Sequence, residues 1–262
     1  MNQPQEKGEN YPDTLHKLRT AKYYAFDLDD TLHNFRSASS TASKSIFSAL
    51  QPLSTSPIHE LESSYQKILS QGTSSAFVDG KTSHQYRSDR FQKLVDAHGI
   101  QLQSGEMQKL VELYERVLME TLERKEGVLE LFQTLKSRGH SIAVVTEGPQ
   151  DAQERTVEAL GITPYIDYLA TTNKLGVAKV DGLFVKVLEH LDLKPADMVV
   201  IGDSWERDVV PASQAGLYCV HYSEKDGSGA IAQGWRVSGL EQLRLLVEAA
   251  HDEPVNLGQN SD

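Results

Sequence analysis

Short apolar runs alternate with helical patterns along most of the chain, and this alternation limits the possible folds more than any other feature. The runs have the length and composition of buried strands, and the segments between them place apolar residues at helical spacing. Strands that alternate with helices form a parallel, doubly wound sheet with right-handed crossovers. The sequence therefore predicts an α/β fold, in which the strands are residues 23–26, 141–146, 168–171, 198–201 and 217–222.

The segment between the first two strands lacks this alternation. It shows helical periods separated by Ser, Gly and Pro, at residues 41–50, 58–70, 84–98 and 106–124. We therefore predict an all-helical insertion. The expected division is an N-terminal extension (1–20), a core (21–33 and 127–250), the insertion (34–126) and a disordered tail (251–262).

Composition and charge restrict the partners of the chain. Its 262 residues carry a formal net charge of −11, which repels nucleic acid and anionic membranes. No apolar run approaches the ~18 residues of a membrane span, and the polar first twenty residues show no secretory signal. Cys219 is the only cysteine, as expected in a reducing compartment. We therefore expect a cytoplasmic protein that binds neither nucleic acid nor membranes.

The first predicted strand ends in acidic residues. Asp27 and Asp29 follow the apolar run and would share a face if the strand continued. Ligands of open α/β sheets bind at the carboxyl ends of the strands. Two carboxylates on one face need a proton or a cation between them, so these acids indicate a divalent metal site. The structural alternative is an Asx-type turn whose acids bond to their own backbone.

Polar residues also follow three other predicted strands. Thr146 ends the second strand and precedes Glu147-Gly148-Pro149 at a helix N-terminus, where a hydroxyl and turn amides suit an anionic oxygen. Lys179 follows the third strand, and Asp203 and Asp208 follow the fourth, where the pattern predicts a helix over residues 205–215. Taken singly, these residues would be helix caps or solvated charges. Because they occur together at successive strand ends, they predict a magnesium site beside a phosphate site.

These motifs, in this order, resemble those of the haloacid dehalogenase superfamily, in its branch of phosphatases with a helical cap. Residues 27–32 match the first motif, Asp-x-Asp-x-Thr, and Thr146 matches the second. Lys179 matches the third, and Gly202-Asp203-Ser204 with Asp208 matches the fourth. The match spans about residues 21–222. It implies a Rossmann-like α/β core and identifies residues 34–126 as a smaller cap domain.

The resemblance implies a Mg²⁺-dependent phosphatase and gives each motif a role. Asp27 would attack phosphorus to form an aspartyl-phosphate, and Asp29 would protonate the leaving group. Thr146 and Lys179 would hold phosphoryl oxygens, and Gly148 would lie beside the substrate. The Mg²⁺ ligands would be Asp27, Asp29 (through its backbone carbonyl), Asp203 and Asp208.

Two departures from the family pattern affect these assignments. Many relatives continue the third motif as Lys-Pro-Asp-Pro, whereas Lys179 precedes Val180-Asp181, which leaves Lys174 as a substitute. The second motif often continues with Asn, and Glu147 stands there in this chain. An acid beside a phosphate pocket would lower the affinity for highly charged substrates.

The cap is where substrate specificity is expected. The predicted helix 84–98 is basic, and Arg87 shares a flank with His84 and Phe91. We predict that Arg87 contacts the substrate, and a solvated basic face is the alternative. The stretch from Gly127 through residue 153 resembles the subgroup of nucleotide and N-acylneuraminate phosphatases. That similarity implies a small phosphorylated metabolite, either a nucleoside monophosphate or a sugar phosphate.

Three other activities stay open. A haloacid dehalogenase would use the same aspartate without a metal, which leaves Asp29, Asp203 and Asp208 without a role. A phosphomutase would pass the phosphoryl group to a second substrate hydroxyl, and nothing in the sequence excludes it. A non-catalytic binding protein would be expected to have lost Asp27 or Asp29, and both are present.

Overall fold

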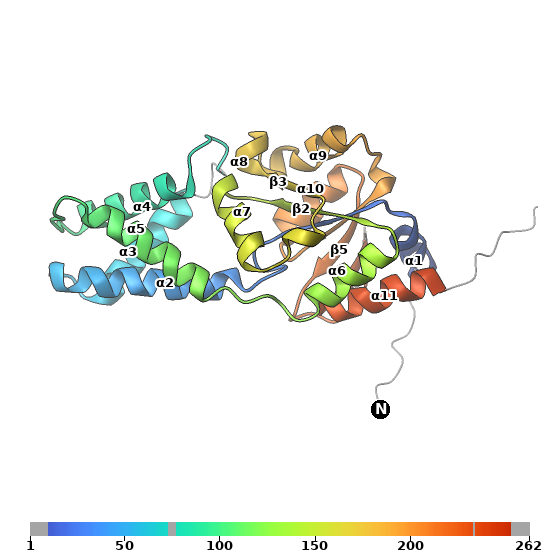
Figure 1. The fold of residues 1–262 in the computed structure, drawn as a ribbon, viewed down its shortest axis with the longest axis horizontal. Coiled ribbons are helices and arrows are strands. Elements are labelled where there is room, and N and C mark those ends of the chain that lie inside the picture. Colours follow the sequence, from blue (N-terminus) through green and yellow to red (C-terminus); the bar gives the residue numbers. More distant parts are fainter. Residues whose placement is uncertain (1–9, 73–76, 233, 253–262) are drawn as a thin grey trace, which may run out of the picture.

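A seven-stranded sheet in the order β3-β2-β1-β4-β5-β7-β6 forms the centre of the molecule (Figure 1). The structure, a computed structural model, describes residues 10–72, 77–232 and 234–252. The strands are β1 (Tyr23–Phe26), β2 (Ser141–Thr146), β3 (Tyr168–Thr171), β4 (Met198–Gly202), β5 (Tyr218–Tyr222), β6 (Gly229–Ile231) and β7 (Gly234–Val237). Neighbouring strands are parallel from β3 to β7, and β6 runs antiparallel at the edge. The predicted doubly wound α/β core is confirmed.

Helices cover both faces of this sheet. Successive side chains of a strand point to opposite faces, so Tyr24 and Phe26 pack on one side and Ala25 on the other. The first face is covered by α1 (Tyr11–Thr20), α6 (Val128–Ser137), α7 (Gln150–Ala159) and α11 (Leu240–Asp252). The second face is covered by α9 (Leu183–Leu191) and α10 (Val210–Gln214). The short helix α8 (Thr172–Leu175) follows β3.

Four helices between β1 and α6 form a separate body at one end of the molecule (Figure 1). They are α2 (Phe35–Leu50), α3 (Ile58–Gly72), α4 (Ser83–Ala97) and α5 (Glu106–Glu120). Their buried side chains, among them Ile46, Leu61 and Phe91, make a hydrophobic cluster distinct from the two clusters of the sheet. On this packing we propose residues 34–126 as the cap and residues 21–33 with 127–250 as the core.

The N-terminal and C-terminal segments differ in part from the prediction. Helix α1 lies within the predicted extension, but its Leu15 and Leu18 are buried in the core beneath α11. Residues 251 and 252 of the predicted disordered tail belong to α11, and residues 1–9 and 253–262 lie outside the described residues. Among the described residues, every helix is too short or too polar to span a membrane.

Two local features were not predicted. The helix expected at 205–215 is divided into a π-helical turn (Trp205–Val209) and α10, and the turn directs the buried Asp208 toward the strand ends. Strands β6 and β7 are short and contain glycine, which weakens any strand pattern. Gly234 is needed there because a Cβ would lie 1.8 Å from the carbonyl oxygen of Cys219 on β5.

Candidate active site

The carboxyl ends of β1 and β4 meet where the strand order reverses. The N–H of Asp27, which follows β1, donates to the carbonyl of Ile201 on β4 over 2.8 Å. The Thr31 hydroxyl donates to Asp27 Oδ2 over 3.1 Å and accepts the N–H of Asp203 over 3.0 Å. In doubly wound sheets this switch point forms the ligand-binding crevice. The fold therefore brings the acids of the first and fourth motifs together.

Lys179 lies between two of these acids. Its Nζ donates to Asp27 Oδ1 over 2.5 Å and to Asp208 Oδ1 over 2.6 Å, and the residue is only 2% exposed. Burial lowers the pKa of the ammonium, but the carboxylates of Asp208 and Asp27 more than offset this and hold its pKa above the usual value. Lys179 is therefore charged. Lys174, the substitute considered above, is exposed and does not line the cavity described below.

Three carboxylates converge beside Lys179. One oxygen each of Asp27, Asp203 and Asp208 lie within 4.8 Å of one another. Burial, followed by repulsion from Asp27, raises the pKa of Asp203 to about 6. Burial also raises the pKa of Asp208, to about 7, although Lys179 opposes the shift. The chain thus gathers more negative charge than one ammonium balances, which favours a bound cation.

Gly202 makes room for this cluster. A Cβ at this position would lie 2.3 Å from Cγ of Asp208, and Asp208 is only 1% exposed. The Asp208 carboxylate is fixed on its other side by the N–H of Ser204, which donates to Oδ2 over 3.1 Å. The glycine of the fourth motif is therefore explained by the close approach of an acid to the backbone.

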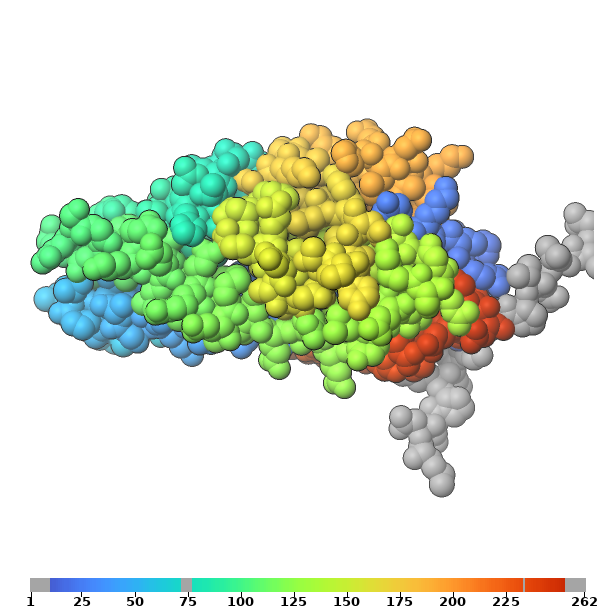
Figure 2. Space-filling model, viewed as in Figure 1, coloured from blue at the N-terminus to red at the C-terminus, as the bar shows by residue number. Residues whose placement is uncertain are grey.

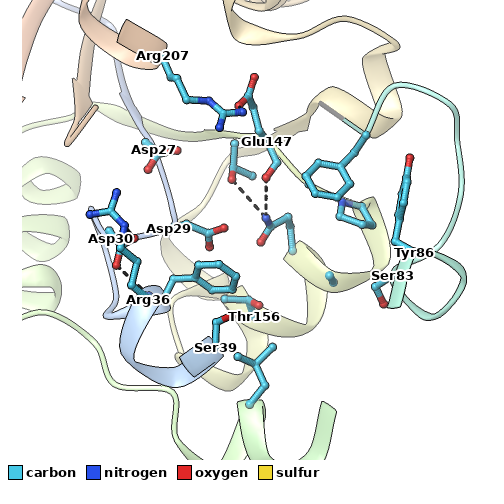
Figure 3. A pocket seen from close by; sticks show the side chains of 18 of the residues that line it. Asp27, Asp29, Asp30, Arg36, Ser39, Ser83, Tyr86, Glu147, Thr156 and Arg207 are labelled. Carbon is cyan, nitrogen blue, oxygen red and sulfur yellow. Dashed lines mark hydrogen bonds and ion pairs between the residues drawn. The ribbon is translucent and has the colours of Figure 1, made fainter. Parts of the chain in front are cut away.

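The second motif forms the opposite side of the site. Thr146 is buried at the end of β2, and Gln153 of α7 donates to its Oγ1 over 3.4 Å and to the Glu147 carbonyl over 3.2 Å (Figure 3). The N–H of Gly148 donates to Thr172 Oγ1 over 3.2 Å. A Cβ on Gly148 would lie 2.4 Å from Gln153 Nε2, so this glycine permits the glutamine to reach Thr146.

Glu147 is neutralised within the site. Its Oε2 forms an ion pair with Arg207 of the π-helical turn (Figure 3). Its Oε1 accepts the N–H of Lys179 over 3.1 Å. The acid that was expected to repel charged substrates therefore ties the second, third and fourth motifs together. No sequence pattern indicates this pairing, because Glu147 and Arg207 are sixty residues apart.

Asp29 is paired with a histidine that the sequence analysis did not single out. His33 is fully buried, and its Nε2 lies 2.9 Å from Asp29 Oδ1. Burial raises the pKa of Asp29, repulsion from Asp27 and Asp30 adds to this, and His33 lowers it in part. The net shift is upward, which suits a carboxyl that must hold a proton before it donates one.

One cavity of about 380 Å³ brings all the predicted site residues together. Those lining it are Asp27, Asp29, Arg87, Thr146, Gly148, Lys179, Asp203 and Asp208. Figure 3 shows Asp27 and Asp29 on the core side and Ser83 and Tyr86 of the cap helix α4 facing them across the cavity. The site is therefore built jointly by core and cap.

Arg87 lies on the cap wall of this cavity with its charge already paired. Its Nη1 donates to Glu115 of α5 over 2.5 Å, and its guanidinium lies 5.0 Å from the centre of the Tyr114 ring. Arg36 of α2, also not singled out from the sequence, joins Asp30 and Asp203 at distances of 3.1 and 3.4 Å. The pairs of Arg87 with Glu115 and of Arg36 with Asp203 connect residues that are distant in sequence, so no local pattern indicated them.

The sequence matches the haloacid dehalogenase-like hydrolase family over residues 21–216, and the chain belongs to this family of hydrolase enzymes. It is 25% identical over 208 residues to a ribulose-1,5-bisphosphate 5-phosphatase of Halopiger xanaduensis, covering 78% of this chain and 86% of that protein. It is 26% identical over 170 residues to the pyrimidine 5'-nucleotidase YjjG of Escherichia coli, covering 63% and 73%.

Solved structures share the fold. YfnB of Bacillus subtilis, solved with magnesium bound, superposes with a TM-score of 0.67 at 23% identity, covering 87% of this chain and 99% of that one. A 2-haloacid dehalogenase of Pseudomonas syringae superposes with a TM-score of 0.65 at 23% identity, covering 87% and 99%. The similarity to both a dehalogenase and a magnesium-bound protein shows that the fold alone does not select the reaction.

Proposed function

We propose that the chain is a Mg²⁺-dependent phosphatase that hydrolyses phosphate monoesters of small metabolites through an aspartyl-phosphate on Asp27. The observation that carries this proposal is the convergence of three carboxylates, Lys179 and Thr146 in one cavity. Similar proteins that are named as phosphatases or nucleotidases support it. By resemblance to the same relatives, we propose nucleoside monophosphates and sugar phosphates as the first substrates to test.

The residues present fit a magnesium ion. The three clustered carboxylates of Asp27, Asp203 and Asp208 offer oxygen ligands alone, which Mg²⁺ prefers. Burial, followed by repulsion from Asp27, raises the pKa of Asp203, and a divalent cation beside these carboxylates would favour their charged forms. Asp27, Asp203, Asp208 and the backbone carbonyl of Asp29 would hold the ion. When bound, Mg²⁺ would neutralise charge on the phosphoryl oxygens.

Asp27 and Asp29 divide the chemistry. A carboxylate oxygen of Asp27 attacks phosphorus, the bond from phosphorus to the ester oxygen breaks, and Asp29 gives its proton to the departing alkoxide. Water then attacks phosphorus and loses a proton to Asp29. The bond between phosphorus and Asp27 breaks, which releases inorganic phosphate and restores both carboxyl groups. His33 holds Asp29 in position through its 2.9 Å contact.

Lys179 and Thr146 position the phosphoryl group between these two steps. The Lys179 ammonium fixes Asp27 and offsets charge on the phosphoryl oxygens, which is the main contribution a protein makes to phosphoryl transfer. The buried Thr146 hydroxyl offers a hydrogen bond from the other side. Gly148 and Arg87 line the cavity beside these groups, and we propose both as substrate neighbours.

A panel of phosphate monoesters tests the proposal. Phosphate release is measured with Mg²⁺ and with EDTA for wild type, Asp27→Asn and, as a control, Asp252→Asn at the exposed end of α11. We expect release by wild type and the control with Mg²⁺, and none with EDTA or with Asp27→Asn. Release that survives Asp27→Asn would contradict the mechanism. Metal-independent halide release from 2-haloacids, without phosphate release, would assign the chain to the dehalogenases instead.

A further inference from the structure

Helix α4 turns one face toward the cavity. It begins with a capping box in which Thr82 Oγ1 accepts the N–H of Gln85 and Gln85 Oε1 accepts the N–H of Thr82. The residues of α4 that line the cavity are Ser83, Tyr86, Arg87 and Arg90. This is the i, i+3, i+4, i+7 spacing of a single helical face. Arg90 therefore stands one turn beyond Arg87 on the same wall.

Arg90 differs from the other arginines of the cavity in its partners. Of the four that line it, three form ion pairs, namely Arg36 with Asp30 and Asp203, Arg87 with Glu115, and Arg207 with Glu147. Among the residues that the structure describes, Arg90 has no carboxylate within ion-pair distance. Its guanidinium lies 5.5 Å from the centre of the Phe77 ring, which also lines the cavity.

The acids nearest to Arg90 along the chain are occupied elsewhere. Asp89 pairs with Lys81 over 3.1 Å, Asp96 accepts Nε2 of Gln92 over 2.8 Å, and Asp79 accepts the Tyr86 hydroxyl. The other cap residues that line the cavity carry no negative charge, and most are apolar or aromatic, including Leu69 and Tyr114. The cap wall thus carries one more positive charge than its neighbours balance, and it does so on a partly buried side chain.

A half-buried guanidinium without a carboxylate matches an anionic ligand. Its planar, forked donors fit a carboxylate or a phosphate with two parallel hydrogen bonds, and Phe77 keeps the plane in place. We propose that Arg90 binds a second anionic group, a carboxylate or a phosphate, on the leaving-group side of the substrate. This inference rests on the proposed phosphatase function and deepens it: the preferred substrates carry an anionic group besides the phosphate that is hydrolysed.

Two matched substrate pairs test the inference and separate the two kinds of anion. Glycerol 3-phosphate and 3-phosphoglycerate differ by a carboxylate, and fructose 6-phosphate and fructose 1,6-bisphosphate differ by a second phosphate. We expect wild type to prefer the more anionic member of at least one pair. Arg90→Gln should lower kcat/KM for that member by about 10- to 100-fold, as expected for the loss of a charge-assisted hydrogen bond, and should leave its partner within about twofold.

Two further variants control the measurement. Lys93→Gln removes an equal charge from an exposed position of α4 and should keep the wild-type preference. Arg90→Lys keeps the charge but loses the fork and should give an intermediate preference. Equal losses of kcat/KM for both members of a pair in Arg90→Gln, or the absence of any preference in wild type, would overturn the inference while leaving the phosphatase proposal standing.

A binding measurement tests the anion site at Arg90 independently of whether the protein hydrolyses any ester. Calorimetric titration of Asp27→Asn with 3-phosphoglycerate and fructose 1,6-bisphosphate requires no turnover. If no ester is hydrolysed by wild type, the proposed function fails. Weaker binding of either ligand after Arg90→Gln, with Lys93→Gln unchanged, would still support an anion site at Arg90, and unchanged binding of both would refute it.

Discussion

At the scale of single residues, the site depends on short distances between buried charged groups. A buried lysine draws two carboxylates together, and a glycine leaves the space that one of them needs. Lys179 holds Asp27 and Asp208 at hydrogen-bond distance, and Gly202 lets Asp208 come that near. Removing one member of such a buried group leaves the others uncompensated, which costs more than the pair itself contributes. Asp27, the proposed nucleophile, is thus oriented by residues from β4 and from the segment after β3.

The Gly202→Ala variant tests this close approach. Its Cβ would meet Asp208 at 2.3 Å, so the side chain or the backbone must move. We expect a loss of about 1–3 kcal/mol in the free energy of unfolding, as for other overpacked sites, together with reduced phosphate release. Urea denaturation and steady-state assays measure both.

Gly227→Ala is the matched control, because a Cβ at Gly227 meets no atom within 4 Å. It should keep wild-type activity and stability. If Gly202→Ala behaves like this control, the proposed constraint on Asp208 is wrong.

Most residues of the candidate site could be predicted from the sequence, but the residues that pair with them could not. The acids, Thr146 and Lys179 could be found because each follows a recognisable strand, and parallel strand ends share one edge. Glu147 with Arg207, and Arg36 with Asp203, could not, because these pairs arise from contacts across the fold. His33 is only four residues from Asp29, but nothing in the sequence distinguishes a histidine that pairs with this acid from one that does not. The prediction that Arg87 contacts the substrate relied on a helical flank, and no sequence pattern shows that Glu115 already pairs with it.

At the scale of elements, the sequence located the strands β1 to β5 well, since each is a short apolar run between helical segments. It did not locate β6 and β7, where glycine and polar residues replace such a run. It also predicted one continuous helix after β4, whereas the chain makes a π-helical turn first. π-Helical insertions are often found at functional sites, and this one positions Asp208.

The contact between α11 and the loop before β2 predicts a pH dependence of stability. His140 is buried in this loop, its Nδ1 lies 2.8 Å from the Ala21 carbonyl, and its Nε2 lies 3.2 Å from His251 of α11. Burial lowers the pKa of His140, the Ala21 carbonyl partly opposes the shift, and His251 adds to it. The unfolded state therefore binds a proton more readily than the folded state.

The sign of the effect follows from this difference. The folded state has its full stability, as far as His140 is concerned, above the pKa of about 6.5 that this histidine has in the unfolded state. That stability decreases as the pH falls from there through the lowered pKa of His140 in the folded state. We expect the free energy of unfolding to drop between pH 7.5 and pH 5.5, and to drop less in His140→Asn, whose amide can still donate to Ala21. The exposed His16→Asn should retain the wild-type drop. An identical drop in His140→Asn would rule out His140 as a source.

At the scale of the whole molecule, the cap and the core are joined by polar contacts beside the cavity. Asp151 of α7 accepts the N–H and the hydroxyl of Ser83 over 2.9 and 2.6 Å, at the N-terminus of α4. Arg155, one turn further along α7, donates to Ser83 Oγ over 2.8 Å and pairs with Glu115 of α5. In the space-filling view the cap and core surfaces meet along this boundary (Figure 2). The contacts stabilise this arrangement of cap and core.

Arg155→Ala tests whether these contacts hold the cap closed. Without the guanidinium, Glu115 pairs only with Arg87 and His84, which both belong to the cap, so the link to α7 is lost. The cap is therefore expected to move away from the core more readily. We predict a KM several-fold above wild type with a smaller change in kcat, and a larger radius of gyration without substrate by small-angle scattering. Arg138→Ala, which removes an exposed ion pair with Asp252 far from the cap, should change neither quantity. Unchanged KM and radius in Arg155→Ala would show that other contacts close the cap.

The most direct test of the central claim is to trap the covalent intermediate. Wild type is mixed with Mg²⁺ and its preferred ester, quenched in acid within a turnover, digested, and analysed by mass spectrometry. Our account predicts a peptide carrying one additional phosphoryl group, with fragmentation that places it on Asp27, and no such peptide from Asp27→Asn. Turnover of the ester with the phosphoryl group on another residue, or with none on the protein at any time before product appears, would contradict it.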